Sequence, residues 1–180
     1  LRSEKEMKSF VIALIGLILL LGCEKESSHH PDDHVLAPVD WSAWNQPELT
    51  RYVLADDLEG LKNRIKEKRE LIYEQSRDGT VLFDAVQHQR HEMVKLLLQE
   101  GSDVNEDLGP MKSNSPNIPS IDRTGYTPIF SAIANSDKKM IEILLRHGAR
   151  LDTEYLGDSP LQISELVGND EVTALLKAHQ

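Results

Sequence analysis

Cysteine is nearly absent from the sequence, since Cys23 is the only one among 180 residues. A disulfide within the chain is therefore excluded, and the fold must be stabilised by packing alone. Basic residues are also few, with 20 Lys and Arg against 30 Asp and Glu, which gives a formal net charge of −10. This balance argues against binding to nucleic acid or anionic lipid, and it suits a partner with a basic face. The same acidity also suits a protein that only needs to stay soluble.

Motifs of the common enzyme classes are missing as well. The sequence has no Gly-x-Ser-x-Gly, no Gly-rich phosphate loop and no His-Glu-x-x-His, so we expect neither a catalytic residue nor a cofactor. Residues 29–34, HHPDDH, bring three imidazoles and two carboxylates together, but a metal site also needs a scaffold that fixes their geometry. His88 and His91 are three residues apart on an expected helix, where we interpret them as solvated surface residues. We therefore predict no metal site.

An unbroken apolar run of 12 residues covers residues 10–21, behind the basic Lys8 and just ahead of Cys23. Its length suits the hydrophobic region of a signal peptide, and it falls short of the roughly 20 residues of a membrane-spanning helix. The ending Leu20-Leu21-Gly22-Cys23 resembles the lipobox of bacterial lipoproteins, in which the cysteine is lipidated and becomes the new N-terminus. An uncleaved anchor, or an ordinary signal peptide followed by a stray cysteine, are the alternatives.

The lipobox resemblance implies that residues 1–22 are a signal peptide and that Cys23 is the lipid attachment site, with Met7 as the expected start. Glu24 follows the cysteine, and the resemblance to enterobacterial sorting then implies the periplasmic face of the outer membrane. Residues 1–22 hold three basic and two acidic residues, so the remaining chain carries a net charge of −11. Residues 23–38 are polar, charged and interrupted by proline, which is typical of a flexible tether.

Residues 39–180 contain an internal repeat, which we expect to form one domain. The segment GTVLFDA, from Gly79, recurs as GYTPIFSA from Gly125 and as GDSPLQIS from Gly157. A second apolar block follows each copy, and the blocks after the first two copies end in GSDVN and GARLD. Thr-Pro is typical of a helix start, and Gly after a Leu-Leu pair is typical of a helix end. The pattern resembles the ankyrin repeat, with its G-x-T-P-L-H-x-A helix start and its G-A-D-V-N ending.

The ankyrin resemblance implies an all-α solenoid of about four repeats over residues 47–180, in which the first and last repeats are degenerate caps. Leu49, Leu61 and Ile65 lie 33 residues, one ankyrin period, before Leu82, Val94 and Leu98, which marks the faint first repeat. We expect Trp41 and Trp44 to cover the exposed end of the stack, and a role as anchors for a partner is the alternative.

Two features depart from the ankyrin pattern. Gly101 and Gly148 are 47 residues apart, and the excess over the period predicts an inserted irregular loop at residues 106–120. The histidine of the consensus is replaced by Phe83, Phe130 and Gln162 in the three clear copies, so the usual polar contacts between repeats should be weaker.

In ankyrin stacks the fingers and the first helices line a concave face, so the resemblance implies which positions contact a partner. These candidate residues are Arg77, Gln87, His88, Met111, Ile118, Arg123, Thr124, Tyr126, Ala134, Asn135, Asp158, Leu166 and Val167. Tyr126, Leu166 and Val167 are the strongest, because an apolar side chain directed at solvent marks an interface. Met111 and Ile118 lie in the inserted loop, which can equally be a neutral insertion.

Small ankyrin lipoproteins of this build resemble the immunity proteins encoded beside type VI secreted phospholipases. The resemblance implies a protein that is not an enzyme, is monomeric when unbound, and inhibits a cognate lipase effector in the periplasm by occluding its active site. Membrane contact would come from the lipid on Cys23 alone, and nucleic acid is not an expected partner. A periplasmic ankyrin scaffold or stress-protection lipoprotein is the alternative.

Overall fold

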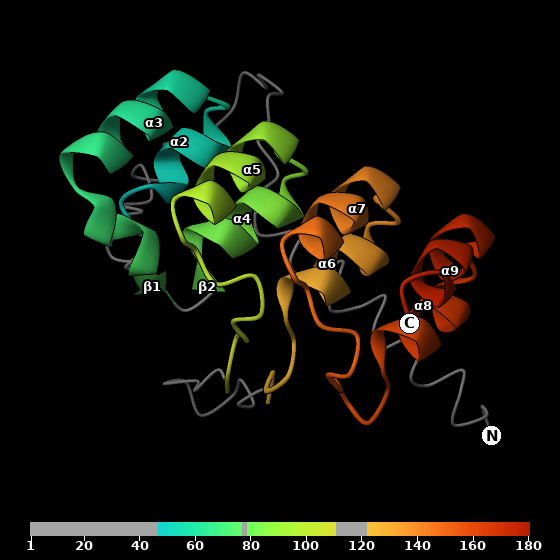
Figure 1. Ribbon diagram of the computed structural model, residues 1–180. Coiled ribbons are helices and arrows are strands. Elements are labelled where there is room, and N and C mark those ends of the chain that lie inside the picture. Colours follow the sequence, from blue (N-terminus) through green and yellow to red (C-terminus); the bar gives the residue numbers. More distant parts are fainter. Residues whose placement is uncertain (1–46, 77–78, 111–121) are drawn as a thin grey trace, which may run out of the picture. The chain divides into compact units, whose positions relative to one another are not determined.

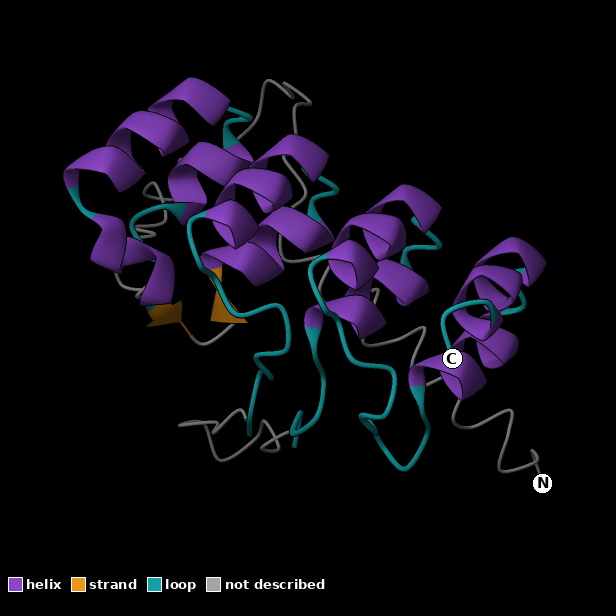
Figure 2. Cartoon of the chain, viewed as in Figure 1, coloured by secondary structure: helices purple, strands orange, loops and turns teal. Residues whose placement is uncertain are grey.

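The computed structural model describes residues 47–76, 79–110 and 122–180, and Figure 1 shows these as a row of paired helices. In chain order the elements are α2 (Thr50–Leu54), α3 (Leu58–Glu67), the 3-10 helix η2 (Arg69–Tyr73), β1 (Gln75–Ser76), β2 (Gly79–Thr80), α4 (Val81–Gln87), α5 (His91–Gln99), α6 (Pro128–Ala134), α7 (Lys138–Arg146), α8 (Pro160–Val167) and α9 (Asp170–Lys177). Loops connect one pair to the next along a single edge (Figure 2). We call these loops the fingers: residues 74–80, 102–127 and 149–159.

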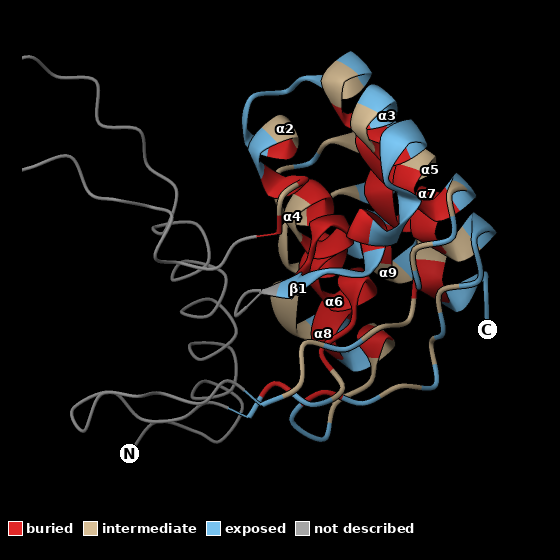
Figure 3. Ribbon diagram, turned by 90° about the vertical axis from the view of Figure 1, so that its left-hand side faces the viewer, coloured by how far each residue is buried: buried red, intermediate tan, exposed pale blue. Residues whose placement is uncertain are grey.

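The helices form two layers. The first helices of the pairs, α2, α4, α6 and α8, contact one another in order, and the second helices α3, α5, α7 and α9 do the same. Buried residues gather between the layers (Figure 3). The largest fully buried side chains are Leu49, Leu61, Ile65, Ile72, Leu82, Met93, Leu97, Ile129, Phe130, Ile133, Met140 and Ile141. The core is thus continuous from one repeat to the next, and it includes the faint first repeat.

Helices α6 and α8 begin as the sequence predicted. Pro128 and Pro160 occupy the first turn, where the missing N–H removes no helical hydrogen bond, and Thr127 and Ser159 are the N-cap residues. At α8 the cap is reciprocal, because the Ser159 side chain accepts from the Gln162 N–H and the Ser159 N–H donates to Gln162 Oε1 at 2.8 Å. Such a capping box satisfies two N–H groups that the helix itself leaves unpaired.

The caps of α4 and α6 differ from that of α8. The hydroxyls of Thr80 and Thr127 are buried and have no hydrogen-bond partner among the described residues. The third residue after each cap is Phe83 or Phe130, which has no polar atom to return the contact, whereas Gln162 of α8 supplies one. Replacing the consensus histidine by phenylalanine therefore removes a polar contact at these two helix starts.

The ends of α5 and α7 also follow the prediction. Gly101 and Gly148 have φ values of 101° and 87°, the left-handed region that glycine adopts without a Cβ clash. The next residue turns back onto the helix, since the N–H of Ser102 donates to the Leu97 carbonyl and that of Ala149 to the Leu144 carbonyl, each at 3.0 Å. These bonds pair carbonyls that would otherwise end the helix unsatisfied.

The described residues form the expected helical stack, and short strands occur at the fingers. β1 and β2 form an antiparallel pair of two residues each, with Gln75 opposite Thr80, and Tyr155 forms an isolated bridge with Asp158. Such short ladders satisfy backbone groups where a finger reverses direction, and they leave the helical stack unchanged.

Several sequence predictions lie outside the described residues. These are the signal peptide, Cys23 and the tether, Trp41 and Trp44, and most of the inserted loop, of which residues 106–110 are described without helix or strand. Within the described ranges, none of the helices combines the length and the apolar character that crossing a membrane requires.

Candidate protein-binding surface

The turns between paired helices carry a row of polar contacts, two of them ion pairs, that join neighbouring repeats. Arg90 pairs with Asp56 at 3.1 Å, His91 contacts Asp137 at 2.8 Å, and the Lys138 ammonium lies 3.5 Å from Glu171. The Asp137 side chain is only 11% exposed, and it also accepts the N–H of Met140 as the N-cap of α7. This edge of the stack already uses its charges internally, so we assign it a structural role.

The prediction that His88 and His91 lie on the same helix is wrong. His88 is the C-cap residue beyond α4, whereas His91 begins α5, because the chain turns at Gln89, whose φ is 55°. Burial lowers the pKa of His88, and the neighbouring Arg90 charge lowers it further. Within the described segments, no group of three or more His, Cys, Asp or Glu side chains is placed to hold a metal ion.

The predicted groove residues at the ends of α4 and α6 do come together. Asn135 Nδ2 donates to the Gln87 carbonyl at 3.5 Å, and both residues are half-buried, as are His88 and Ala134. The contact joins the second and third repeats, so these positions form one continuous strip along the first-helix layer. Only part of each side chain is available to a partner.

Leu166 and Val167 are half-buried at the end of α8. Val167 lines a shallow hollow of about 450 Å³ between the α6–α7 turn and the α8–α9 turn. The other lining residues are Ser136, Lys138, Gly168, Asn169, Asp170 and Glu171. Because most of these are polar, Val167 is the main apolar contact that the hollow offers.

The expectation that Tyr126 faces solvent is wrong, since the residue is only 7% exposed. Its ring stacks on Phe130 with centroids 5.9 Å apart and meets the edge of Tyr155 at 4.7 Å. The Ser131 side chain hydrogen-bonds the Tyr126 hydroxyl, and burial raises the pKa of this phenol. Arg123, also expected on the surface, is buried at 7% exposure. The aromatic ring is therefore a core group that joins the third repeat to the following finger.

The remaining predicted positions lie on or near the fingers. Thr124 is exposed, and its N–H donates to Asp122 Oδ1 at 3.0 Å, which fixes a tight turn. Asp158 is half-buried in the last finger, paired through its backbone with Tyr155. Arg77, Met111 and Ile118 lie outside the described residues.

The base of the inserted loop is pinned to the start of the third repeat. Asp107 accepts the N–H of Gly125 at 3.2 Å through one oxygen and that of Gly109 at 2.9 Å through the other. The Leu108 N–H donates to the Tyr126 carbonyl at 3.2 Å. Residues 107–109 and 125–126 therefore lie side by side, and the insertion leaves the repeat register intact.

Neighbouring fingers pack against each other at glycines. A Cβ at Gly79 would overlap the Leu108 side chain, and a Cβ at Gly125 would overlap the Glu154 carbonyl oxygen. Gly157 of the last finger differs, because no atom of the described chain lies within 4 Å of such a Cβ. This finger has an open side, next to the exposed Leu156. The sequence analysis missed Leu156, although an apolar residue directly before a turn glycine was a signal that could have marked it.

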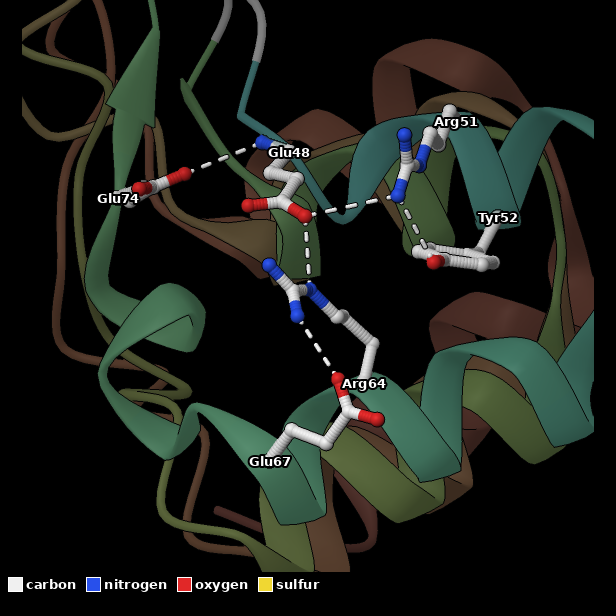
Figure 4. A network of polar contacts seen from close by, with 6 residues as sticks. All are labelled: Glu48, Arg51, Tyr52, Arg64, Glu67 and Glu74. Atoms are coloured by element: carbon white, nitrogen blue, oxygen red, sulfur yellow. Dashed lines mark hydrogen bonds and ion pairs between the residues drawn. The ribbon is translucent and has the colours of Figure 1, made fainter.

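A polar network closes the N-terminal end of the described stack (Figure 4). Glu48 Oε1 accepts from Arg64 Nε at 2.7 Å, and a second Arg64 nitrogen donates to Glu67 at 2.8 Å. The Glu48 N–H donates to a Glu74 carboxylate oxygen at 3.1 Å. The hydrogen bond from Arg64 is the main reason that the pKa of Glu48 is lowered. The network ties α3 to the residues that precede α2 and β1, which is a structural role.

Comparison with known proteins identifies the repeats. Residues 82–145 match the family model described as ankyrin repeats (many copies). Among solved structures, the chain is similar to the ankyrin repeat domain of Bcl-3, a member of the IkappaB protein family, with a TM-score of 0.56 and 22% sequence identity. The match covers 72% of this chain and 50% of that one, so this chain spans half of the other's length. Residues 82–145 thus carry ankyrin repeats, and the described stack has the fold of an ankyrin-repeat domain.

Proposed function

We propose that this protein acts by binding another protein through its first-helix layer and its fingers. Stacked repeats create extended concave surfaces, which solenoid proteins use for recognition. The observation that carries the proposal is the charge of the fingers, which hold nine carboxylates against four basic side chains, among them the guanidinium groups of Arg123 and Arg150. One guanidinium, of Arg123, is buried, and the other, of Arg150, pairs with Asp152 at 2.8 Å. The surface therefore suits a basic protein face.

Within this class, the partner in our proposal is a secreted antibacterial phospholipase, and the protein is its immunity protein. The lipobox-like ending at Cys23 and the resemblance to small ankyrin immunity lipoproteins support this assignment. The protein would cover the entrance to the phospholipase active site, so that lipid cannot reach the nucleophile. An interface of about 1,600 Å² with a few buried anchor residues is the usual size for such stable inhibition.

A lipid on Cys23 would place the inhibitor where the enzyme acts. A tethered binder meets its target at a raised effective concentration, so modest intrinsic affinity is enough for occupancy at the membrane surface. The proposal therefore locates the protein on the periplasmic face of the outer membrane, anchored by lipid alone. An envelope scaffold with the same fold would need no such enzyme partner.

Co-expression tests the proposal. A candidate secreted phospholipase is directed to the periplasm, alone or together with the full chain, and survival is counted. We expect survival only with both proteins. A matched control is the phospholipase with its catalytic serine replaced, which should be harmless in either case. Killing that is unchanged by the chain would contradict immunity and leave the scaffold role.

A further inference from the structure

The last finger ends in a tight hairpin with an unusual residue at its tip. Tyr155 and Asp158 exchange both backbone hydrogen bonds, at 3.0 and 3.1 Å. The two residues between them, Leu156 and Gly157, have φ values of 55° and 81°. Positive φ at both central residues defines a type I′ turn, in which Asn, Asp or Gly is preferred at the first position. Leu156 therefore occupies a conformation that its side chain disfavours.

Within the described residues, burial does little to compensate this strain. The Leu156 side chain is 47% exposed, so burial returns little stabilisation. The other positive-φ residues with side chains in the described ranges are Asp56, Gln89 and Ser136, all polar and all in turns between paired helices. Leu156 is thus the one apolar side chain held in this way in the described structure. Strained residues that the fold does not need are characteristic of functional positions.

The surroundings of Leu156 indicate what would cover it. Asp152, Glu154 and Asp158 belong to the same finger, which carries a single guanidinium, that of Arg150, already paired with Asp152. Among the described residues, no finger covers Gly157, whereas the corresponding glycines of the earlier fingers are covered by the next finger. An apolar tip on a finger whose net charge is negative matches an apolar pocket that has basic residues near its rim. Anionic lipid is disfavoured, because these carboxylates would be repelled by it.

We infer that Leu156 is an anchor residue that enters an apolar pocket on a protein partner, with basic residues of that partner facing the acidic finger that carries it. The inference rests on the protein-binding role proposed above, but not on the partner being a phospholipase. A side chain that fills a pocket at the centre of an interface commonly dominates the affinity. The hairpin fixes the position of Leu156 before binding, so little ordering is needed on association.

The substitution Leu156→Asn separates an anchor from a structural residue. Asparagine is favoured in this turn, so the melting temperature of the variant should equal or exceed that of the wild type. A lower melting temperature would mean that leucine stabilises the hairpin itself, and it would overturn the inference. The matched control is Leu54→Asn, because Leu54 is similarly exposed at 42% and lies at the end of α2 opposite the fingers.

The probe is a phage-displayed library of random 12-residue peptides, selected on the full chain. We expect enrichment of peptides that combine Lys or Arg with an apolar residue. Their binding should weaken at least tenfold on Leu156→Asn and stay unchanged on Leu54→Asn. The inference would be overturned if the selected peptides bound Leu156→Asn and Leu54→Asn equally well, or if no peptide were enriched on the wild type. It would also be overturned if the chain bound phosphatidylglycerol vesicles in a way that depends on Leu156. Peptide binding without protection from the phospholipase would refute immunity alone.

Discussion

Replacing Gly125 with alanine should destabilise the stack in two ways that can be separated. Its φ of 82° is in the left-handed region, where any residue with a Cβ loses about 1–2 kcal/mol. The new methyl group would also overlap the Glu154 carbonyl oxygen, which is backbone and can only yield if the last finger moves. Forced overpacking of this kind typically adds about 1–3 kcal/mol, so the total loss should be roughly 2–5 kcal/mol.

Gly157→Ala is the matched control for this prediction. Its φ of 81° is nearly the same, yet nothing in the described chain lies within 4 Å of the added Cβ. The control should therefore lose only the backbone contribution of about 1–2 kcal/mol. Urea unfolding followed by circular dichroism at 222 nm gives both free energies. Equal losses in the two variants would refute the claim that the fingers pack against each other through Gly125.

Three further predictions concern other contacts. Tyr126→Ala should lose about 3–5 kcal/mol of unfolding free energy, because it empties the site between Phe130 and Tyr155; an unchanged urea midpoint would contradict the burial of this ring. Burial raises the Tyr126 pKa above the ordinary value of about 10, so on raising the pH the hydroxyl is deprotonated in the unfolded chain before it is in the folded one. The stability that neutral Tyr126 contributes should therefore be present below about pH 10 and fall as the pH rises further. Ultraviolet titration at 295 nm would test this. A Tyr126→Phe variant that loses the same amount of folding stability at alkaline pH would contradict it. Asp137→Asn should retain the cap of α7 and lose only the contact with His91. Asp137→Ala should lower the free energy of unfolding by a further ~1 kcal/mol, because the cap is lost as well. Equal urea midpoints of the two variants would contradict the capping role.

Local sequence chemistry predicted much of the fold. Thr127-Pro128 and Ser159-Pro160 begin helices where expected, and Gly101 ends one, because these features depend on residues within one turn of each other. The faint first repeat could also be predicted, since its period-matched leucines are buried in the same core.

The exposure of the candidate site residues was harder to predict, because it depends on distant parts of the chain. Tyr126 is covered by Tyr155, which is 29 positions later and belongs to the next finger, and nothing within the third repeat reveals this contact. Leu156 was missed for a related reason, because the ankyrin pattern has no counterpart for a left-handed leucine. The error at His88 and His91 came from a helix pattern that runs past the turn at Gln89.

Inhibition of a purified candidate phospholipase tests the proposed function most directly. The enzyme is assayed for release of fatty acid from phosphatidylethanolamine vesicles while the full chain is added in increasing amounts. We predict that activity falls to background near one chain per enzyme, and that the Leu156→Asn variant is needed in at least tenfold excess. Undiminished hydrolysis at a tenfold excess of the wild-type chain would contradict the proposal that this protein neutralises a phospholipase.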